Sequence, residues 1–335
     1  MIAAAALYLF YAAVSPAACA GCHKSQAQTE PATPMGHALE PVEGCDILRE
    51  HPRLTFQSGR YSYTITRKGA QSIYSVTDGA ATLTVPIGWA FGLGEAGQTY
   101  VFERDGIFYE SRVSFYKAIN GLDITMGGRA AEPQDLTQAA GREMSHKDVA
   151  DCFGCHTTGA IRASTVHFED MQAGVQCENC HPKAAAHMAA LKTGDTQAAA
   201  MPHLAGMTAE ETSEFCGRCH RTWAQIAGGG PLGILNIRFQ PYRLTNSKCY
   251  DATDQRISCL ACHNPHVDLV RNTASYDSKC QACHSQRANS PGKVCHVATQ
   301  DCAGCHMPKL ELPGAHRKFT DHEIRIVRAN GAYPD

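Results

Sequence analysis

One short motif, Cys-x-x-Cys-His, occurs seven times in this chain and restricts its fold more than any other feature. Six copies lie within residues 152–306, and a seventh stands alone at residues 19–23. With 17 Cys and 17 His in 335 residues, random placement would produce about 0.04 copies of the motif. The repetition therefore reflects one chemical task carried out seven times.

Each copy combines two thiols with a histidine directly after the second thiol. The thiols can add across the two vinyl groups of a haem, and the imidazole can then reach the iron from one side. The motifs therefore predict seven covalently attached haem c groups, held by Cys19, Cys22, Cys152, Cys155, Cys177, Cys180, Cys216, Cys219, Cys259, Cys262, Cys280, Cys283, Cys302 and Cys305. The predicted proximal iron ligands are His23, His156, His181, His220, His263, His284 and His306.

Zinc sites and redox-active dithiols also use Cys-x-x-Cys. Neither requires a histidine directly after the second cysteine, and a thioredoxin-like motif occurs once in a βαβ context rather than seven times. Haem attachment explains the whole repeat, and the other two chemistries do not.

The haem groups also determine what the composition can mean. The segment 152–306 is too short to wrap six macrocycles and build a separate apolar core, so we expect the porphyrins to form the core there. The formal net charge is −2, and each haem adds two propionates, which predicts an acidic protein. Nucleic acid is excluded as a partner because it requires a basic face. Cationic partners, metal ions or other haem proteins fit better.

Three cysteines lie outside the motifs. They are Cys45, Cys249 and Cys295. Because Cys249 and Cys295 fall in adjoining loops of the same region, we predict that they form a disulfide in an oxidising compartment. Cys45 would then be free or paired with another molecule.

Residues 1–18 form an apolar N-terminal segment that ends in the small-x-small pattern Ser15-Pro16-Ala17. A secretory signal fits this pattern, although no Lys or Arg precedes the apolar run. A retained segment and a membrane anchor are the alternatives, and the run is short for a membrane span. Each interpretation places the protein outside the cytoplasm, in the periplasm or the extracellular space.

The remaining chain divides into three parts. Residues 19–51 carry the first motif. Residues 52–128 alternate β-branched and aromatic residues between Gly-containing turns, which predicts a haem-free antiparallel β domain of six or seven strands. We expect this unit to serve for packing or docking rather than substrate binding. Residues 129–335 form the six-haem domain, with short helices around most motifs, a capping box at TAEE and an ordered loop between the fourth and fifth motifs.

Ten histidines remain to supply a second axial ligand to each iron. Seven are favoured as sixth ligands: His37, His51, His146, His187, His266, His316 and His322. Three others are less favoured: His167, His203 and His296. Met35 and Met144 are alternatives, and a methionine ligand would raise the potential of its haem.

Several of these motifs, with their flanking residues, resemble one group of cytochromes. The matching sequences are CAGCH followed by TPMGH, GVQCENCHPKAAAH, FCGRCH, CLACHNPH, and CAGCHMPK followed by GAH and TDH. They resemble the multihaem c-type cytochromes related to the tetrahaem electron acceptor of hydroxylamine oxidation, a group that includes extracellular multihaem cytochromes. The resemblance covers residues 19–41 and 146–322. It implies closely stacked haem pairs, mostly bis-His, in a fold with little regular structure. The antiparallel β domain lies outside the resemblance, so we expect an α+β fold with much irregular structure and an inserted β domain.

Two functions follow from these features. The first is electron transfer along closely spaced haems to other redox proteins or extracellular acceptors, without catalysis. The second is an oxidoreductase of nitrogen or sulfur compounds with one five-coordinate haem, for which the segment Lys248-Cys249-Tyr250 could cover an open iron. No Cys-x-x-Cys-Lys motif supports the second function.

The long separation of the first motif from the others raises a question of assembly. Either the chain folds back to place that haem beside the cluster, or the haem meets the far end of another copy. The second arrangement is a head-to-tail contact that would produce a filament. A monomer or small oligomer is the alternative.

Overall fold

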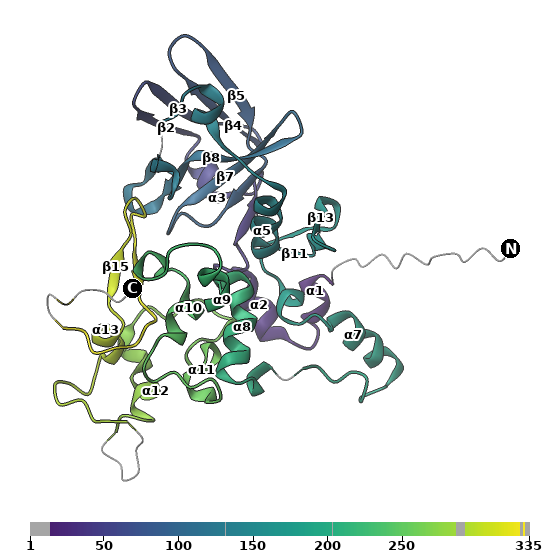
Figure 1. Ribbon diagram of the computed structural model, residues 1–335. Coiled ribbons are helices and arrows are strands. Elements are labelled where there is room, and N and C mark those ends of the chain that lie inside the picture. Colours follow the sequence, from purple (N-terminus) through teal and green to yellow (C-terminus); the bar gives the residue numbers. More distant parts are fainter. Residues whose placement is uncertain (1–13, 131, 203, 286–291, 329–330, 332–335) are drawn as a thin grey trace.

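A β-rich part and a helical part make up the molecule, which we describe from a computed structural model. It describes residues 14–130, 132–202, 204–285, 292–328 and 331. The β-rich part lies at the top of Figure 1, and the helices that carry most motifs lie below it. Within the described residues, none of the helices combines the length and the apolar character that crossing a membrane requires.

The first sheet is a four-stranded antiparallel meander. Tyr61, Tyr63 and Ile65 alternate with polar residues along one strand and are buried, as the two-residue period of a half-buried strand requires. In order, the strands are β2 (Arg53–Ser58), β3 (Tyr61–Lys68), β4 (Gln71–Thr77) and β5 (Thr82–Pro86).

The second sheet has six strands and extends beyond the boundaries predicted from the sequence. Its path is β1 (Leu39–Pro41), β6 (Trp89–Phe91), β7 (Gln98–Arg104), β8 (Ile107–Tyr116) and β10 (Gly141–Glu143), and β9 (Gly121–Ile124) also pairs with β8. Residues 53–124 thus hold eight strands rather than six or seven. The two edge strands come from outside 52–128, because three-residue strands are too short to display an alternating pattern.

Aromatic side chains form the core between the two sheets. Tyr63 stacks on Tyr74, and Phe102 stacks on Tyr109. Cys45 is buried in the same core, with its thiol 3.3 Å from the Gln98 amide oxygen. Burial raises the pKa of the Cys45 thiol to about 11. Cys45 is therefore a free, protonated core residue and is not available to another molecule.

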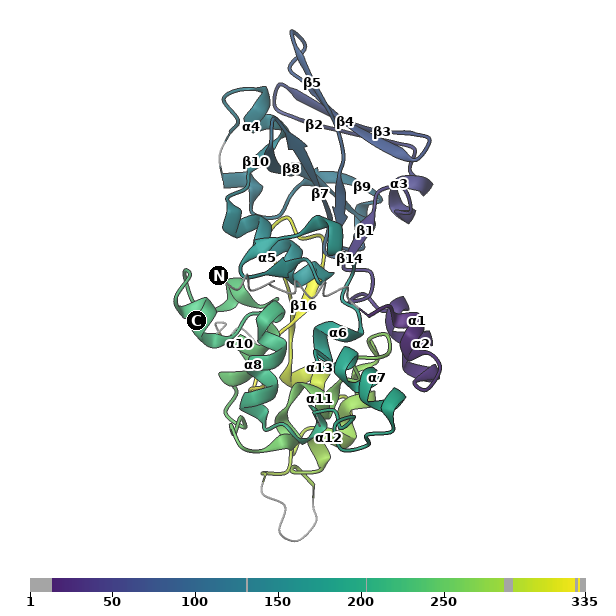
Figure 2. The same cartoon turned by 90° about the vertical axis from the view of Figure 1, so that its right-hand side faces the viewer.

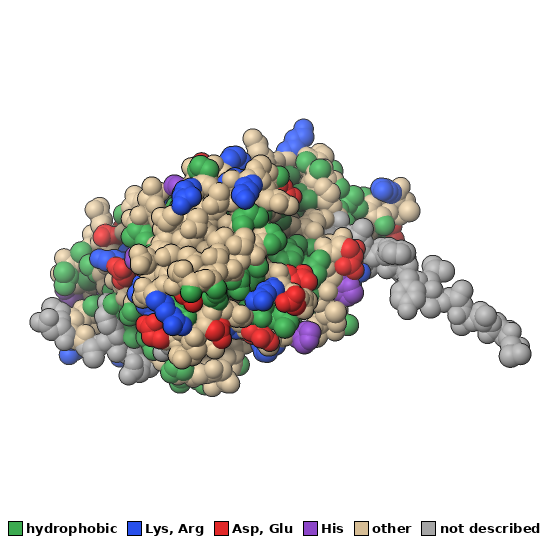
Figure 3. Space-filling model, turned by 90° about the horizontal axis from the view of Figure 1, so that it is seen from above, with side chains coloured by type: hydrophobic (Ala, Val, Ile, Leu, Met, Phe, Trp, Pro, Cys, Tyr) green, Lys and Arg blue, Asp and Glu red, His purple; other side chains and the backbone are tan. Residues whose placement is uncertain are grey.

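Seen from above, the face over the β-rich part carries charges of both signs. Lys and Arg side chains are interspersed with Asp and Glu around apolar groups, and neither sign gathers into one patch (Figure 3).

A second aromatic cluster joins the β-rich part to the helix that carries the motif at Cys152. Helix α5 (His146–His156) begins with a capping box formed by Ser145 and Asp148. Its Phe153 is fully buried and meets the rings of Trp89 and Phe91 edge-on at 5.2 and 5.1 Å. The β unit is therefore continuous with the haem-motif region and is not a separate module.

The helical part consists mostly of short segments. Besides α5, its longest helices are α8 (Ala209–His220) and α7 (Ala184–Thr193), and α8 has the predicted capping box between Thr208 and Glu211. The others are α1 (Pro16–Cys19), α2 (Lys24–Thr29), α6 (Cys177–Cys180), α9 (Trp223–Ala227), α10 (Gln240–Thr245), α11 (Cys259–Cys262), α12 (Asp277–Gln281) and α13 (Cys302–His306). In Figures 1 and 2, α1 and α2 lie beside α7.

Short secondary elements complete the fold. Helices α3 (Asp46–Glu50) and α4 (Leu136–Ala140) pack on the β unit. Three two-stranded sheets flank the haem motifs: β11 (Thr157–Thr158) with β14 (Gln172–Ala173), β12 (Ile161–Arg162) with β13 (Thr165–Val166), and β15 (Lys309–Glu311) with β16 (Lys318–Thr320). Among the described residues of the helical part, the separate apolar core is limited to Ile237, Leu312 and Ala315 with a few half-buried neighbours.

The segment between the fourth and fifth motifs is more ordered than the predicted loop. It forms α10, whose Arg243 is completely buried. Arg243 donates two hydrogen bonds to the Asp321 carboxylate, at 2.9 and 3.0 Å, and lies 2.7 Å from Glu323. This ion-pair network attaches α10 to the C-terminal segment. The sequence period did not predict α10, because the network that holds it comes from residues far along the chain.

Replacing Arg243 by Leu should destabilise the protein strongly. Removing one partner of a buried ion pair leaves an uncompensated charge and typically costs about 3–5 kcal/mol. Denaturant unfolding followed by circular dichroism measures the loss. Arg49→Leu removes an exposed arginine that pairs with Asp46 and should leave the unfolding midpoint near that of the wild type. Equal, small effects of the two variants would contradict a structural role for the network.

Candidate haem-binding site

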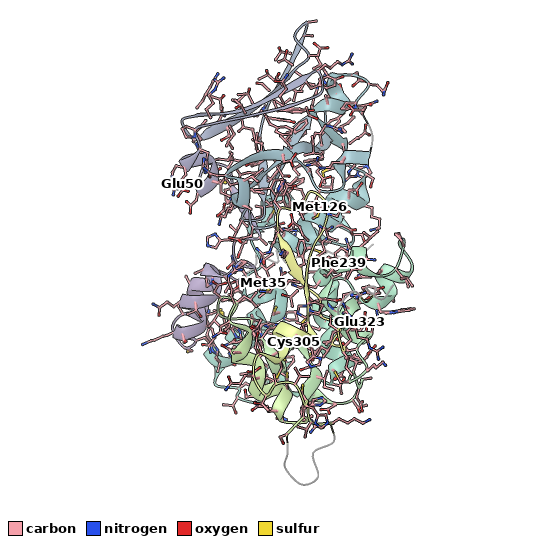
Figure 4. The ribbon with its side chains drawn as sticks, turned by 90° about the vertical axis from the view of Figure 1, so that its left-hand side faces the viewer. Met35, Glu50, Met126, Phe239, Cys305 and Glu323 are labelled. Carbon is pink, nitrogen blue, oxygen red and sulfur yellow. The ribbon has the colours of Figure 1, made fainter. Side chains whose placement is uncertain are left out.

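Five of the seven motifs line a single cavity of about 2400 Å³. We number the motifs in chain order. The first to seventh motifs are residues 19–23, 152–156, 177–181, 216–220, 259–263, 280–284 and 302–306. The cavity is lined by motifs one to five and by apolar side chains such as Met35, Met126 and Phe239, which lie between the β unit and the helices in Figure 4. An apolar hollow with paired thiols and imidazoles on its wall fits haem c.

The sixth and seventh motifs lie side by side next to this cavity. The Asp277 carboxylate on α12 accepts hydrogen bonds from the backbone N–H groups of Asp301 and Cys302, both at 2.8 Å. The side chains of Cys280 and Cys302 are also hydrogen-bond neighbours. One carboxylate thus holds the start of the seventh motif against the helix of the sixth.

Cysteine contacts arrange the motifs in a continuous series. Neighbouring cysteine side chains link the first motif to the third, the second to the fourth, and the fourth to the fifth, through Cys19–Cys177, Cys155–Cys219 and Cys216–Cys259. Burial and, secondly, Cys216 raise the pKa of Cys180, and burial and Cys280 raise that of Cys262, so the third motif lies near the fourth and the fifth near the sixth. The first motif is therefore not isolated, because the chain folds back and places it beside the third.

Three histidine pairs have the spacing that an intervening iron requires. The ring centroids of His23 and His187 are 6.4 Å apart, and those of His181 and His266 and of His263 and His322 are 6.2 Å apart. Metal–imidazole bonds are about 2 Å long, so two rings on opposite sides of one metal have centroids roughly 6 Å apart. The first, third and fifth motifs thus each face one of the predicted sixth ligands.

Hydrogen bonds to the backbone orient several motif histidines and candidate sixth ligands for metal binding. The Nδ1 atoms of His156, His284 and His306 each donate to a backbone carbonyl at 2.8 Å. His187 and His322 donate in the same way to Ala199 and Thr320. Since Nδ1 carries the proton, Nε2 keeps its lone pair for a metal.

Burial keeps the distal ring of the fifth motif neutral. Removal from water lowers the pKa of His322 to about 4, and the neighbouring His263 contributes in the same direction. A metal binds only the neutral imidazole, so this environment favours ligation at neutral pH.

Two predicted sixth ligands lie elsewhere. His51 packs against Phe115 in the β unit, with ring centroids 4.8 Å apart. The Nε2 atom of His316 is 2.7 Å from the Asp123 carboxylate, so the nitrogen that would bind iron is already hydrogen-bonded. The sequence suggested both residues only because spare histidines were available. In the structure, His51 and His316 instead contact residues of the β unit that are far from them in the chain.

The other candidate ligands occupy varied positions. His146 and Met35 line the cavity. His37 is half-exposed, with its Nδ1 3.1 Å from Glu40. Met144 is buried in the aromatic cluster that includes Phe153. His167 contacts Glu169, His296 is exposed, and His203 and residues 1–13 lie outside the described part of the chain.

The predicted disulfide between Cys249 and Cys295 is not formed. Both cysteines are free and exposed. The partial burial of its thiol, and then Cys280 and Cys283 of the sixth motif, raise the pKa of Cys249. Tyr250 beside it donates its hydroxyl to Glu210 at 2.8 Å. The two cysteines lie in adjoining loops of the sequence, but the fold places Cys249 beside the sixth motif and not beside Cys295.

Sequence reasoning missed Glu30, a buried carboxyl on the cavity wall. It is 7% exposed, and its Oε2 atom has no hydrogen-bond partner among the described residues. Burial raises the pKa of Glu30. One acidic residue in a polar segment carries no sequence signal of burial, so only the packing of the first motif against the third could identify it.

The Glu30→Gln variant should become relatively more stable as pH rises. Because the folded-state pKa is raised, the contribution of Glu30 to stability is full below its unfolded pKa and is lost as pH rises through the folded pKa. Glutamine keeps the shape without this loss. In thermal unfolding at pH 4 and pH 8, the melting temperature of the variant should exceed that of the wild type at pH 8 more than at pH 4. A gain of the same size at both pH values would argue against a buried, ionising carboxyl.

Comparisons with known proteins agree with the motifs. Residues 117–182 match the family described as Cytochrome c554 and c-prime, a match that begins inside the β unit. The chain is 27% identical over 197 residues to Multiheme cytochrome MtrA of Shewanella baltica (strain OS185), covering 56% of this chain and 49% of that protein. It is 24% identical over 188 residues to High-molecular-weight cytochrome c of Nitratidesulfovibrio vulgaris (strain Hildenborough), covering 53% and 28%. No solved structure matches the chain.

Together, the attachment motifs and these matches define a haem protein of the c type. The chain is a multihaem c-type cytochrome. It spans less than half of the length of either relative.

Proposed function

We propose that the protein is a heptahaem electron carrier whose haems are mostly bis-His and pass electrons along the series of motifs. The three imidazole pairs at 6.2–6.4 Å carry this proposal. When both axial positions of an iron are occupied, no coordination site is left for a substrate. The continuous contacts from the first motif to the seventh support electron transfer through the whole series rather than storage at isolated sites.

The chain's own residues hold and orient the haems. The cysteine pairs would fix the macrocycles, and the motif histidines would hold the irons. Nδ1 is tied to a backbone carbonyl in five of the candidate ligands, which leaves Nε2 free for iron: His156, His187, His284, His306 and His322. Bound haem iron supplies one-electron chemistry. The apolar wall, with Met35, Met126 and Phe239, excludes water from the cavity and keeps neighbouring haems close.

An oxidoreductase of nitrogen or sulfur compounds is the second candidate. Among the described residues, the second, fourth, sixth and seventh motifs have no imidazole within the ring-to-ring spacing of the three pairs. One of these irons would have to remain five-coordinate. Electron paramagnetic resonance of the oxidised protein separates the two functions, because a five-coordinate haem gives a high-spin signal.

We place this activity in the periplasm or outside the cell, with other redox proteins or extracellular acceptors as partners. Seven haems would add propionate charge to a chain of net charge −2, which favours cationic partners. The head-to-tail polymer loses its premise, because the first motif lies beside the third within one chain. We therefore favour a unit that conducts electrons by itself.

Replacing His322 by Ala should convert one low-spin haem to high-spin. The ring opposite His263 would be lost, and the spin state of the oxidised protein reports it directly. His316→Ala is the matched control, since His316 bonds Asp123, and it should leave the low-spin signal intact. If His316→Ala creates the high-spin haem and His322→Ala does not, the pairing proposed for the fifth motif is wrong.

The purified protein should carry seven covalent haems per chain. All seven motifs are complete, so each has the two thiols and the histidine that attachment needs. Intact-protein mass together with a pyridine haemochrome assay gives the count. Replacing both cysteines of one motif by Ala should reduce the count by one. A count below six in the unaltered protein would be incompatible with a continuous electron path.

A further inference from the structure

Three arginines line the cavity near the second and fourth motifs. They are Arg218, Arg221 and Arg238. Arg218 donates hydrogen bonds to the backbone carbonyls of Phe215 and Asn179, both at 3.1 Å. Arg221 is 3.4 Å from the Asp151 carboxylate. Lys147 binds the same carboxylate more closely, at 2.6 Å. The fold thus concentrates positive charge at this end of the cavity.

Arg238 has no carboxylate partner among the described residues. Its guanidinium lies over the Phe239 ring at 4.9 Å. Its side chain is exposed to the cavity. The protein atoms around the guanidinium and, secondly, the charge of Arg221 lower the pKa of Arg238, while Glu110 acts in the opposite direction and is itself paired with Arg142 at 3.1 Å. An arginine in these surroundings lacks the anion that would normally accompany it.

Arg243 provides the contrast within the same segment. Arg243 is completely buried, and the fold supplies it with Asp321 and Glu323, whereas the side chain of Arg238 is open to the cavity. The chain therefore compensates a buried arginine where no ligand enters and leaves Arg238 uncompensated where it faces the cavity. A carboxylate brought by a ligand would complete the site, because guanidinium groups bind carboxylates in paired hydrogen bonds.

The position of Arg238 associates it with the haem of the fourth motif. Arg221 directly follows the proximal His220, and its left-handed backbone, with φ of 62°, ends α8 and turns the chain. Gln240, two residues after Arg238, lies beside His220 and raises its pKa against the larger effect of burial. Both arginines therefore flank the iron ligand of this motif.

We propose that Arg238, supported by Arg221, binds a propionate carboxylate of the haem attached at Cys216 and Cys219 and raises the reduction potential of that haem. The proposal rests on the electron-carrier function argued above. Reduction lowers the positive charge of the iron by one unit, so a nearby cation that neutralises the propionate favours the ferrous state. The fourth motif contacts the second, third and fifth, so its potential controls where electrons reside at the junction of the series.

Spectroelectrochemical titration of the purified holoprotein tests this site. The variants are Arg238→Gln, which removes the charge, Arg238→Lys, which keeps it, and Arg49→Gln, which removes an exposed charge in the β unit. We expect Arg238→Gln to lower one haem's potential so that its reduced-to-oxidised ratio at fixed potential falls about tenfold, or ~59 mV for a one-electron couple. Arg238→Lys should recover most of the shift, and Arg49→Gln should produce none.

Several outcomes would overturn the proposal. Potentials of Arg238→Gln that match the wild type would reject it, as would an equal shift in Arg49→Gln or no recovery with Arg238→Lys. If Arg238→Gln does not retain its haems, Arg221→Gln serves instead and should lower the same potential by a smaller factor. No shift in Arg221→Gln then rejects the site. Haem counting and spin state of the wild type test the electron-carrier function separately, so the two failures are distinguishable.

Discussion

The helical half of this protein is arranged around cofactors, and the rest of the structure depends on that constraint. Its apolar side chains form only a small cluster around Ile237, while five motifs face a cavity of about 2400 Å³. Short helices suit this arrangement, since each needs only to present two thiols and one imidazole to the hollow. Covalent attachment replaces the large hydrophobic interface that would otherwise be required to hold such short segments together.

The β unit contributes by rigidity rather than by chemistry. It contains none of the motifs, yet its Trp89 and Phe91 pack against Phe153 on the helix of the second motif, and Phe91 contacts the ring of His156 edge-on at 5.2 Å. The carbonyl of Ala38, next to edge strand β1, accepts the Nδ1 proton of His156. One proximal ligand is thereby positioned by the β unit and its flanking segment, which explains why the unit is fused to the haem region instead of joined by a linker.

Charge in the cavity is distributed unevenly between its two ends. The carboxyl of Glu30 is buried near the first and third motifs, and Arg221 and Arg238 lie near the fourth. A negative group favours ferric iron and a positive group favours ferrous iron, so under the proposal for Arg238 this distribution would bias electrons towards the junction of the series. Such a bias would come from residues that lie outside the attachment motifs.

The sequence by itself determined the chemistry of each site and the existence of the β unit. Thiol and histidine spacing within five residues is a local covalent requirement, and strand alternation is a local packing requirement, so both can be read without knowing the fold. The tertiary structure alone decided which rings face one another, that the first motif returns to the third, and that His51 and His316 lie against the β unit. It also decided that Arg243 is compensated and Arg238 is not. These features depend on contacts between segments far apart in the chain, for which a single sequence carries no periodic or compositional signal.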